Sequence, residues 1–230
     1  MVLGFQVLDR HRTVPRELVE LARDIPVANI SDCMSRMSAG GAGLALLNTD
    51  LGTRMAGPAL TVKTRPGDNL MVHKAISMIE PGDVLVVDAG GDLTNAIVGE
   101  IMVAAAVAKE VAGLVVHGAV RDAATLRAGD LPVFASGVTH RGPYKDGPGE
   151  VNVPVSLGGM VVEPGDLVVG DADGVLSIPF AVVRDVLDAA RAKSDHEAVA
   201  IRRAAAGERD ETWIDRRLAE QGYRAPAPAP

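Results

Sequence analysis

The sequence predicts an α/β domain built around parallel strands, and three observations support that prediction. Short apolar runs alternate with helical patterns across residues 84–138, in the order strand, helix, strand, helix, strand. The length of 230 residues suits one domain with terminal arms. Apolar residues make up 47% of the chain and aromatic residues 3%, so the core is expected to consist of Val, Ala, Leu and Ile.

Two helical segments are expected ahead of this region. Residues 15–39 carry apolar residues at helical spacing, with a break at Pro26. Pro15 suits the first turn of one helix, and Asn29 or Ser31 can cap the next. A strand is then expected over residues 59–64 and a short helix over residues 69–79.

The turn sequence Glu-Pro-Gly-Asp occurs twice, each time directly before an apolar strand pattern. The first copy is Glu80–Asp83 and the second is Glu163–Asp166. Pro fixes φ at the first corner of a turn and Gly accepts a positive φ at the second, so both copies predict a type II turn. They are too short to indicate a structural repeat.

The central pattern predicts strands at 84–88, 113–118 and 133–137, with helices at about 94–111 and 122–127 between them. A loop-rich stretch, 139–159, leads to paired strands with a tight hairpin at Asp171–Gly174. Charged helical patterns follow over 180–206 and 213–221, and the tail ends in APAPAP. The predicted organisation is an N-terminal helical arm (1–24), an α/β catalytic core (25–180), C-terminal helices (181–222) and a disordered tail (223–230).

Composition excludes several classes of function. A formal charge of −7 argues against nucleic-acid binding, because phosphate neutralisation needs clustered Lys and Arg. A single cysteine, Cys33, rules out a thiolate metal cage, and the histidines form no close pair. The N-terminus lacks the pattern of a signal peptide, and no apolar run reaches membrane-spanning length. We therefore expect a cytoplasmic protein without membrane contact.

The first candidate for the site is Arg121-Asp122, which follows a buried strand at its carboxyl end. Sheets of this class usually bind ligands at that edge. Arg suits a carboxylate or enolate oxygen, and Asp is a hard ligand for Mg²⁺ or Mn²⁺. Adjacent residues of regular structure face opposite ways, so the two side chains are expected to address different groups. The alternative is a surface ion pair with Asp122 as a helix N-cap.

The second candidate is the start of the helix that precedes this strand. Gly99 before a helix lets backbone amides converge on an anion, and the helix dipole favours the negative charge. Glu100 lies one crossover away from Arg121, so both can point into one crevice. There Glu100 would hold water or act as a base; the alternative is an exposed glutamate in a first helical turn.

These segments together resemble a known family. They read GDVLVVDAGG (82–91), Gly99-Glu100 with HGAVRD (117–122), GPGEVNVPVSLGG (147–159) and PGDLVVGDADGV (164–175). The chain is similar over roughly residues 25–205 to the regulator of ribonuclease activity A-like family. That family includes the class II aldolases of 4-hydroxy-4-methyl-2-oxoglutarate and 4-carboxy-4-hydroxy-2-oxoadipate.

The resemblance implies a β/β/α swivelling-type fold, like that of phosphohistidine domains, assembled as a homotrimer or hexamer with sites between subunits. It implies a divalent metal, Mg²⁺ or Mn²⁺, held directly by Asp122 and through water by Glu100 and by Glu197 of a neighbouring subunit. Pyruvate would be bound by Arg121 and the backbone amides of Gly99, Glu100, Ile101 and Met102. Some family members carry Asp where this chain has Glu100.

The activity implied is a pyruvate-forming retro-aldol cleavage of a 4-hydroxy-2-oxo acid, with oxaloacetate decarboxylation as a side activity. Both reactions leave a pyruvate enolate, which a divalent metal and Arg121 would stabilise. Arg141 and Lys145 are candidate contacts for the second carboxylate of the substrate. The alternative function is that of the founding family member, a protein that binds and regulates an RNA-degrading enzyme without catalysis.

Overall fold

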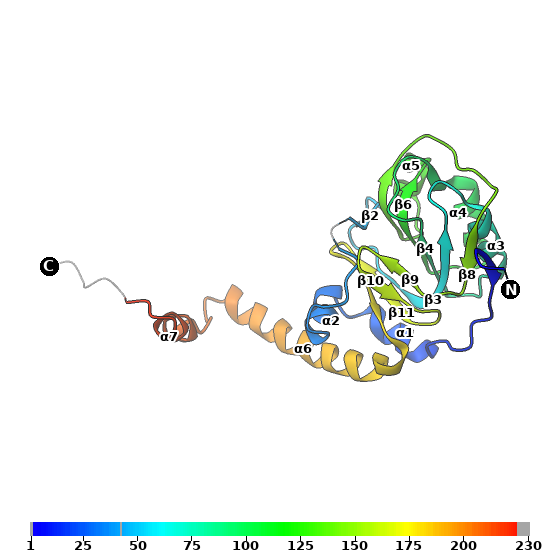
Figure 1. Ribbon diagram of the computed structural model, residues 1–230. Coiled ribbons are helices and arrows are strands. Elements are labelled where there is room, and N and C mark those ends of the chain that lie inside the picture. Colours follow the sequence, from blue (N-terminus) through cyan, green and yellow to red (C-terminus); the bar gives the residue numbers. More distant parts are fainter. Residues whose placement is uncertain (1, 42, 225–230) are drawn as a thin grey trace. The chain divides into compact units, whose positions relative to one another are not determined.

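The computed structural model describes residues 2–41 and 43–224, and the chain divides into two compact units, residues 1–191 and 192–230 (Figure 1). The strands of the first unit are β1 Phe5–Val7, β2 Ala45–Leu46, β3 Met55–Thr64, β4 Val84–Asp88, β5 Ala96–Val98, β6 Gly113–Val120, β7 Val133–Val138, β8 Gly149–Val151, β9 Val155–Leu157, β10 Met160–Val162, β11 Leu167–Asp171 and β12 Gly174–Ile178. Its helices are α1 Arg16–Arg23, α2 Val27–Cys33, α3 Leu70–Met78, α4 Glu100–Val107, α5 Ala123–Ala128, the 3₁₀ turn η1 Phe180–Val182 and the first part of α6 Val183–Ala205.

The centre of the sheet is the parallel set that the sequence predicts. Strands β3, β4, β6 and β7 lie side by side and all run the same way, with α3, α4 and α5 in the crossovers. The strand β8 pairs antiparallel with β3, and β2 pairs antiparallel with β7. The first residues of β3 also pair with β11, which forms the predicted hairpin with β12 through Asp171–Gly174. The mixed α/β class is confirmed.

Alternate residues of β4 show that this sheet is covered on both faces. Val84 and Val86 pack with α1, α2 and the strands from β9 to β12. Leu85 and Val87 pack with α3 and α4. Because successive strand side chains point to opposite faces, the sheet lies between a β-rich layer and a helical layer. The layer of α3 and α4 lies beside β4 in Figure 1.

Three local expectations were wrong. Residues 5–7, within the expected N-terminal helical arm, form β1, because they extend the sheet by parallel pairing with β8. The expected helix 94–111 begins only at Glu100, since residues 96–98 form β5 and pair with the end of β6. Helix α2 begins after Pro26, so neither Asn29 nor Ser31 caps it. At residues 96–98 strand pairing outweighs the local helical pattern, and Pro26 sets the start of α2.

Both Glu-Pro-Gly-Asp turns have the predicted geometry. Gly82 and Gly165 have φ of 90° and 82°. The amide of the Asp donates to the carbonyl of the Glu, at 3.1 Å in both copies. Each Asp is buried and accepts a hydrogen bond back from the amide of its Glu, at 2.9 Å for Asp83 and 3.0 Å for Asp166.

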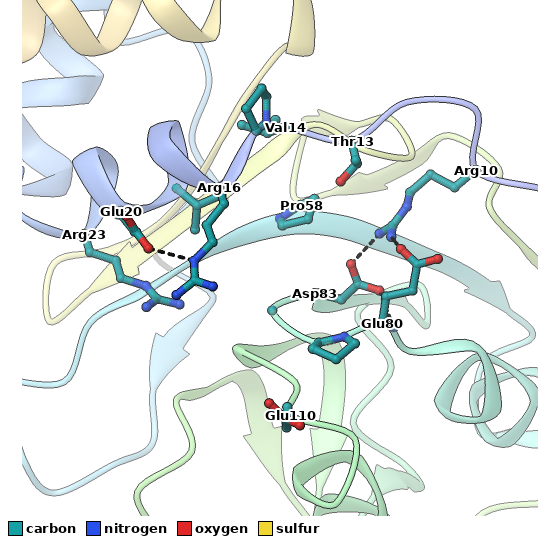
Figure 2. Close-up of a pocket in the computed structure, with 14 residues that line it drawn as sticks. Arg10, Thr13, Val14, Arg16, Glu20, Arg23, Pro58, Glu80, Asp83 and Glu110 are labelled. Carbon is teal, nitrogen blue, oxygen red and sulfur yellow. Dashed lines mark hydrogen bonds and ion pairs between the residues drawn. The ribbon is translucent and has the colours of Figure 1, made fainter.

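One short segment of the N-terminal part binds both turns. Arg10 lies 2.5 Å from Asp83 and 2.5 Å from Glu80 (Figure 2). Arg12 lies 2.5 Å from Glu163 and 3.1 Å from Asp166. Arg10 and Asp83 are both almost fully buried, so this pair is the one whose loss should matter for stability.

The second unit comprises the end of α6 and α7 Thr212–Glu220. Within α6, Lys193 lies 2.7 Å from Glu197. No residue of α7 is buried, and Trp213 and Leu218 expose apolar surface. The part of the tail from 225 to 230, expected to be disordered, lies outside the described residues. Within the described residues, no helix has the length and apolar character needed to cross a membrane.

The buried pair at the first turn predicts a pH-dependent loss of stability. Burial raises the pKa of Asp83, and hydrogen bonding to Arg10 opposes that rise. Arg10→Met should cost about 3 kcal/mol, because Asp83 is left buried without its cation. In this variant the pKa of Asp83 is higher in the folded state than in the unfolded state. The free energy of unfolding therefore falls as pH rises from the unfolded-state pKa to the folded-state pKa.

Thermal unfolding at pH 5 and pH 8 measures this, with a larger deficit in Tm expected at pH 8. The control is Arg16→Met, which removes an exposed pair with Glu20 and should change stability by less than about 1 kcal/mol. Equal deficits for the two variants would contradict the role of Arg10.

Candidate functional site

The two candidate segments meet at the carboxyl edge of the parallel strands. β5 pairs with the end of β6, and the Arg121 amide donates to the Val98 carbonyl at 2.9 Å. This pairing brings the start of α4 next to the residues that follow β6. The sequence placed Glu100 and Arg121 one crossover apart, and the fold brings them together.

Gly99 is the point of closest approach. A Cβ at this position would lie 2.6 Å from Asp122 Oδ2 and 2.9 Å from both Cγ and Nε of Arg121. No side chain larger than hydrogen fits there without moving these groups. Glycine at 99 is therefore required by the packing of two functional side chains, and its own φ of −144° is ordinary extended backbone.

Asp122 has the left-handed backbone conformation, with φ of 58° and ψ of 39°. Its Oδ2 accepts a hydrogen bond from the Glu100 amide at 2.9 Å and lies 3.7 Å from Arg121 Nε. The left-handed turn at Asp122 brings both side chains against Gly99, although the residues are adjacent in sequence. Asp122 precedes α5 at the N-cap position, but its side chain caps α4 instead of α5.

Two of the four backbone amides that were predicted to bind an anion already donate hydrogen bonds within the protein. The Glu100 amide donates to Asp122 and the Met102 amide donates to the Gly99 carbonyl at 3.0 Å. Among the described residues, the amides of Gly99 and Ile101 have no recorded acceptor. These two N–H groups, at the positive end of α4, remain for an anion.

A cavity of about 230 Å³ opens beside these groups. Of the predicted residues, Gly99, Ile101, Met102, Arg121 and Lys145 line it. Glu100 and Asp122 lie next to these residues but are not among those that line it; the Glu100 carboxylate is 3.4 Å from the Thr125 hydroxyl. Arg141 does not line the cavity, and its carbonyl accepts the Ala96 amide at 2.8 Å.

Sequence reasoning missed two residues of the cavity wall, Asn69 and His73. Asn69 directly precedes α3 and His73 lies one helical turn further on. The available signal was their spacing of four residues on a helix that leaves the same edge of the sheet. Asn69 is buried, and its side-chain amide donates to the Ile97 carbonyl at 2.9 Å, which fixes the strand before Gly99.

Three side chains that can carry positive charge line this cavity. They are Arg121, whose side chain is 42% exposed, Lys145 and His73. Burial, together with the nearby positive charge of Lys145, lowers the pKa of His73. A cavity lined by both Arg121 and Lys145 suits a small molecule with two negative groups.

Glu197, the acid expected from a neighbouring subunit, lies on α6 in the second unit and pairs with Lys193 there. Among the described residues, no group of three or more His, Cys, Asp or Glu side chains could hold a metal ion by itself. Any metal at Asp122 would therefore take most of its ligands from water or from bound molecules.

A larger cavity, of about 560 Å³, lies at the opposite edge of the sheet, where β4 begins (Figure 2). Its charged groups pair with one another: Arg10 binds Asp83 and Glu80, and Arg16 lies 2.8 Å from Glu20. Four acids and three arginines line it, so this cavity offers an anionic ligand little net positive charge.

Comparison with known proteins agrees with the fold. The family described as RraA-like, Aldolase/RraA, matches residues 27–177. The chain is 43% identical over 177 residues to a Halalkalibacterium halodurans protein named "Putative 4-hydroxy-4-methyl-2-oxoglutarate aldolase", covering 76% of this chain and 83% of that one. The chain belongs to the RraA-like family.

Two solved structures extend the comparison. Streptomyces coelicolor RraAS2, described as an unusual member of the RNase ES inhibitor RraA family, superposes with a TM-score of 0.74 at 30% identity, over 82% of this chain and 97% of that one. The RNA-processing inhibitor RraA from Thermus thermophilis superposes with a TM-score of 0.62 at 34% identity, over 68% and 93%.

The backbone at Asp122 predicts an unusual order of stabilities. Glycine adopts the left-handed conformation without strain, whereas alanine does not, so Asp122→Gly should be more stable than Asp122→Ala by about 1 kcal/mol. Chemical denaturation measures the difference. The same two substitutions at Asp130, which has no positive φ, should show glycine equal to or less stable than alanine. The same order at both positions would contradict the prediction.

Proposed function

We propose that this protein is a divalent-metal-dependent aldolase that cleaves 4-hydroxy-4-methyl-2-oxoglutarate, or a related 4-hydroxy-2-oxo acid, to pyruvate. We further propose oxaloacetate decarboxylation as a second activity. The observation that carries the proposal is the convergence of Arg121, Asp122 and the start of α4 on Gly99, beside a small cavity lined by Arg121 and Lys145. The named relative from Halalkalibacterium halodurans supports it.

Arg121 and the free amides of Gly99 and Ile101 would bind the 2-oxo acid end of the substrate. The Arg121 guanidinium can pair with a carboxylate oxygen, and it can stabilise the oxygen on which negative charge develops. Gly142 lies against this guanidinium, since a Cβ there would be 3.2 Å from Nη1 of Arg121. The guanidinium is thus held along the cavity wall.

The donor set at Asp122 fits a Mg²⁺ or Mn²⁺ ion. One carboxylate oxygen accepts the Glu100 amide, the side chain is 40% exposed, and the exposed Glu100 lies next to it. Mg²⁺ commonly binds through one or two carboxylates and keeps several waters. When bound, the ion would act as a Lewis acid towards the keto and carboxylate oxygens.

The cleavage itself needs one base. We assign Glu100 to accept the proton of the C4 hydroxyl through a bridging water. The C4 oxygen then forms a carbonyl, the C3–C4 bond breaks, and its electron pair forms the pyruvate enolate, which is protonated at C3. For 4-hydroxy-4-methyl-2-oxoglutarate both products are pyruvate.

Lys145 and His73 would bind the second carboxylate of the substrate, because they line the same cavity as Arg121 and can supply positive charge to a second anionic group. Lys145 was one of two residues that the sequence indicated for this role. Arg141 is dropped, since it does not line the cavity.

The surface of α4 supports assembly of several copies, as a homotrimer or hexamer. This helix has apolar residues on every side, and Ile101 and Val107 are 80% and 50% exposed. Helices of this kind are normally covered. We propose that a neighbouring subunit covers α4 and supplies Glu197, which would hold metal waters. The β-rich layer, central sheet and helical layer likewise support a β/β/α swivelling-type fold.

The direct test is a pyruvate-release assay. The substrates are 4-hydroxy-4-methyl-2-oxoglutarate and oxaloacetate, with Mg²⁺ or Mn²⁺ and with EDTA. We expect metal-dependent turnover that falls by about 10²–10³ in Arg121→Ala, because a donor to the developing charge is lost. Asp122→Ala should lose turnover as well.

Arg141→Ala is the matched control and should retain activity, since this arginine lies near the cavity without lining it. The absence of turnover of either substrate with any divalent metal at micromolar enzyme would rule out the aldolase.

The lowered pKa of His73 predicts a pH-dependent preference for dicarboxylates. His73 becomes positively charged at a lower pH than an ordinary histidine. The part of the cavity lined by His73 and Lys145 therefore becomes more cationic as pH falls below about 6.5. The ratio of kcat/KM for 4-hydroxy-4-methyl-2-oxoglutarate to that for 4-hydroxy-2-oxopentanoate, which lacks the distal carboxylate, should then rise. Groups that act on both substrates change the two kcat/KM values by the same factor, so their titration does not alter this ratio. In His73→Gln it should be flat, and an unchanged slope in this variant would contradict the assignment.

The alternative is a regulator that binds an RNA-degrading enzyme. It is favoured by the 34% identity to the RNA-processing inhibitor RraA. Binding of such an enzyme that survives Arg121→Ala, in a protein that releases no pyruvate, would support this function.

A further inference from the structure

The carboxylate of Asp68 joins two separate segments that line the candidate cavity. It is fully buried at the turn between β3 and α3. One oxygen, Oδ1, accepts the amide of Leu70 at 2.9 Å. The other, Oδ2, accepts the amides of Asp146 and Gly147 at 2.7 and 2.9 Å, and lies 3.2 Å from Nη2 of Arg65.

The backbone on either side of Asp68 is hydrogen-bonded to the same loop. The Asn69 amide donates to the Tyr144 carbonyl at 3.0 Å, and the Tyr144 amide donates to the Gly67 carbonyl at 2.8 Å. Residues 67–69 and residues 144–147 are thus fastened together at the side chain and at the backbone. The side-chain part depends on Asp68 alone.

Each of the two joined segments carries residues that line the cavity. Asn69 and His73 are on the side of α3, and Pro143 and Lys145 are on the side of the loop. The pyruvate end of the cavity is held in addition by the pairing of β5 with β6 and by the packing at Gly99, to which Asp68 does not contribute. Loss of Asp68 should therefore disturb the position of Lys145 more than it disturbs the pyruvate end.

Lys145 depends on this loop for its position. Its side chain is exposed and makes no ion pair within the described residues. The placement of its charge is therefore set by the backbone of residues 144–147, in which Asp68 holds the amides of Asp146 and Gly147.

We propose that Asp68 is a positioning residue that sets the place of Lys145 relative to α3, and thereby the preference for substrates with a second carboxylate. This inference rests on the proposed aldolase function. Asp68 touches no reacting atom, so it should act on KM for dicarboxylate substrates and leave the chemical step nearly unchanged.

Two substitutions separate the roles of the carboxylate. In Asp68→Ser the hydroxyl can still accept the Leu70 amide two residues on, but it is too short to hold the loop. In Asp68→Asn one of the two positions becomes a donor and faces a backbone N–H. Asp166→Asn is the matched control, because Asp166 also accepts two backbone amides and pairs with an arginine, far from the cavity.

The first measurement is the kinetics of both aldol substrates. Relative to wild type, Asp68→Ser should raise KM for 4-hydroxy-4-methyl-2-oxoglutarate by about tenfold or more, the factor set by loss of a charge-assisted hydrogen bond. Its kinetics with 4-hydroxy-2-oxopentanoate should change little. In a Lys145→Met background the same substitution should have almost no further effect on KM, because the two residues act on one interaction.

The second measurement does not need turnover. Amide hydrogen exchange of residues 144–147 should accelerate by tenfold or more in Asp68→Ser and stay at the wild-type rate in Asp166→Asn, with the amides of β4 and β6 protected in both. If wild type releases no pyruvate from either substrate, the proposed function fails, and exchange still decides whether Asp68 holds the loop.

The inference is overturned by unchanged exchange at 144–147, by equal rises in KM for both substrates, or by full additivity with Lys145→Met. If Asp68→Asn fails to fold, Asp68→Ser, which keeps the start of α3, supplies the decisive comparison.

Discussion

The close approach of Arg121 and Asp122 to the α-carbon of Gly99 is the constraint on which the candidate site depends. It requires a residue without a side chain at 99, a left-handed backbone at 122 and a strand, β5, that brings the start of α4 against the end of β6. Each of these features is unfavourable or unusual in isolation. Together they hold a guanidinium, a carboxylate and two free amides within one small region.

The two edges of the sheet have different charge balances. Where β4 begins, four acids accompany three arginines around the cavity, and the buried Asp83 is compensated by Arg10. Where β4 and β6 end, none of the described residues that line the cavity is an acid; Arg121 lies 3.7 Å from Asp122 outside this lining, and Lys145 makes no ion pair within the described residues. Compensated charge stabilises a fold, whereas uncompensated charge is available to a ligand. On this criterion the smaller cavity is the better candidate for function.

Whether the sequence predicted a structural feature depended on how far apart along the chain the interacting residues lie. The parallel strands, the hairpin at Asp171–Gly174 and the two type II turns depend on neighbours in the sequence, and the pattern showed them. The pairing of β1 with β8 and of β5 with β6 depends on partners elsewhere along the chain, so the local sequence pattern did not show these two strands. Arg121, Gly99 and Lys145 were found from motifs and resemblance. Asn69 and His73 were not, because only the packing of α3 brings them to the site.

The connection made by residues 10–12 has a consequence for how such a chain can vary. Arg10 and Arg12 stand two positions apart, and each binds a different Glu-Pro-Gly-Asp turn. The turns are separated by more than eighty residues in sequence, yet the spacing of the two arginines must match the distance between them in space. A single inserted residue would move one guanidinium out of reach, whereas many substitutions at His11 would not. The segment that carries Arg10 and Arg12 should therefore tolerate substitutions between the two arginines but not insertions or deletions there.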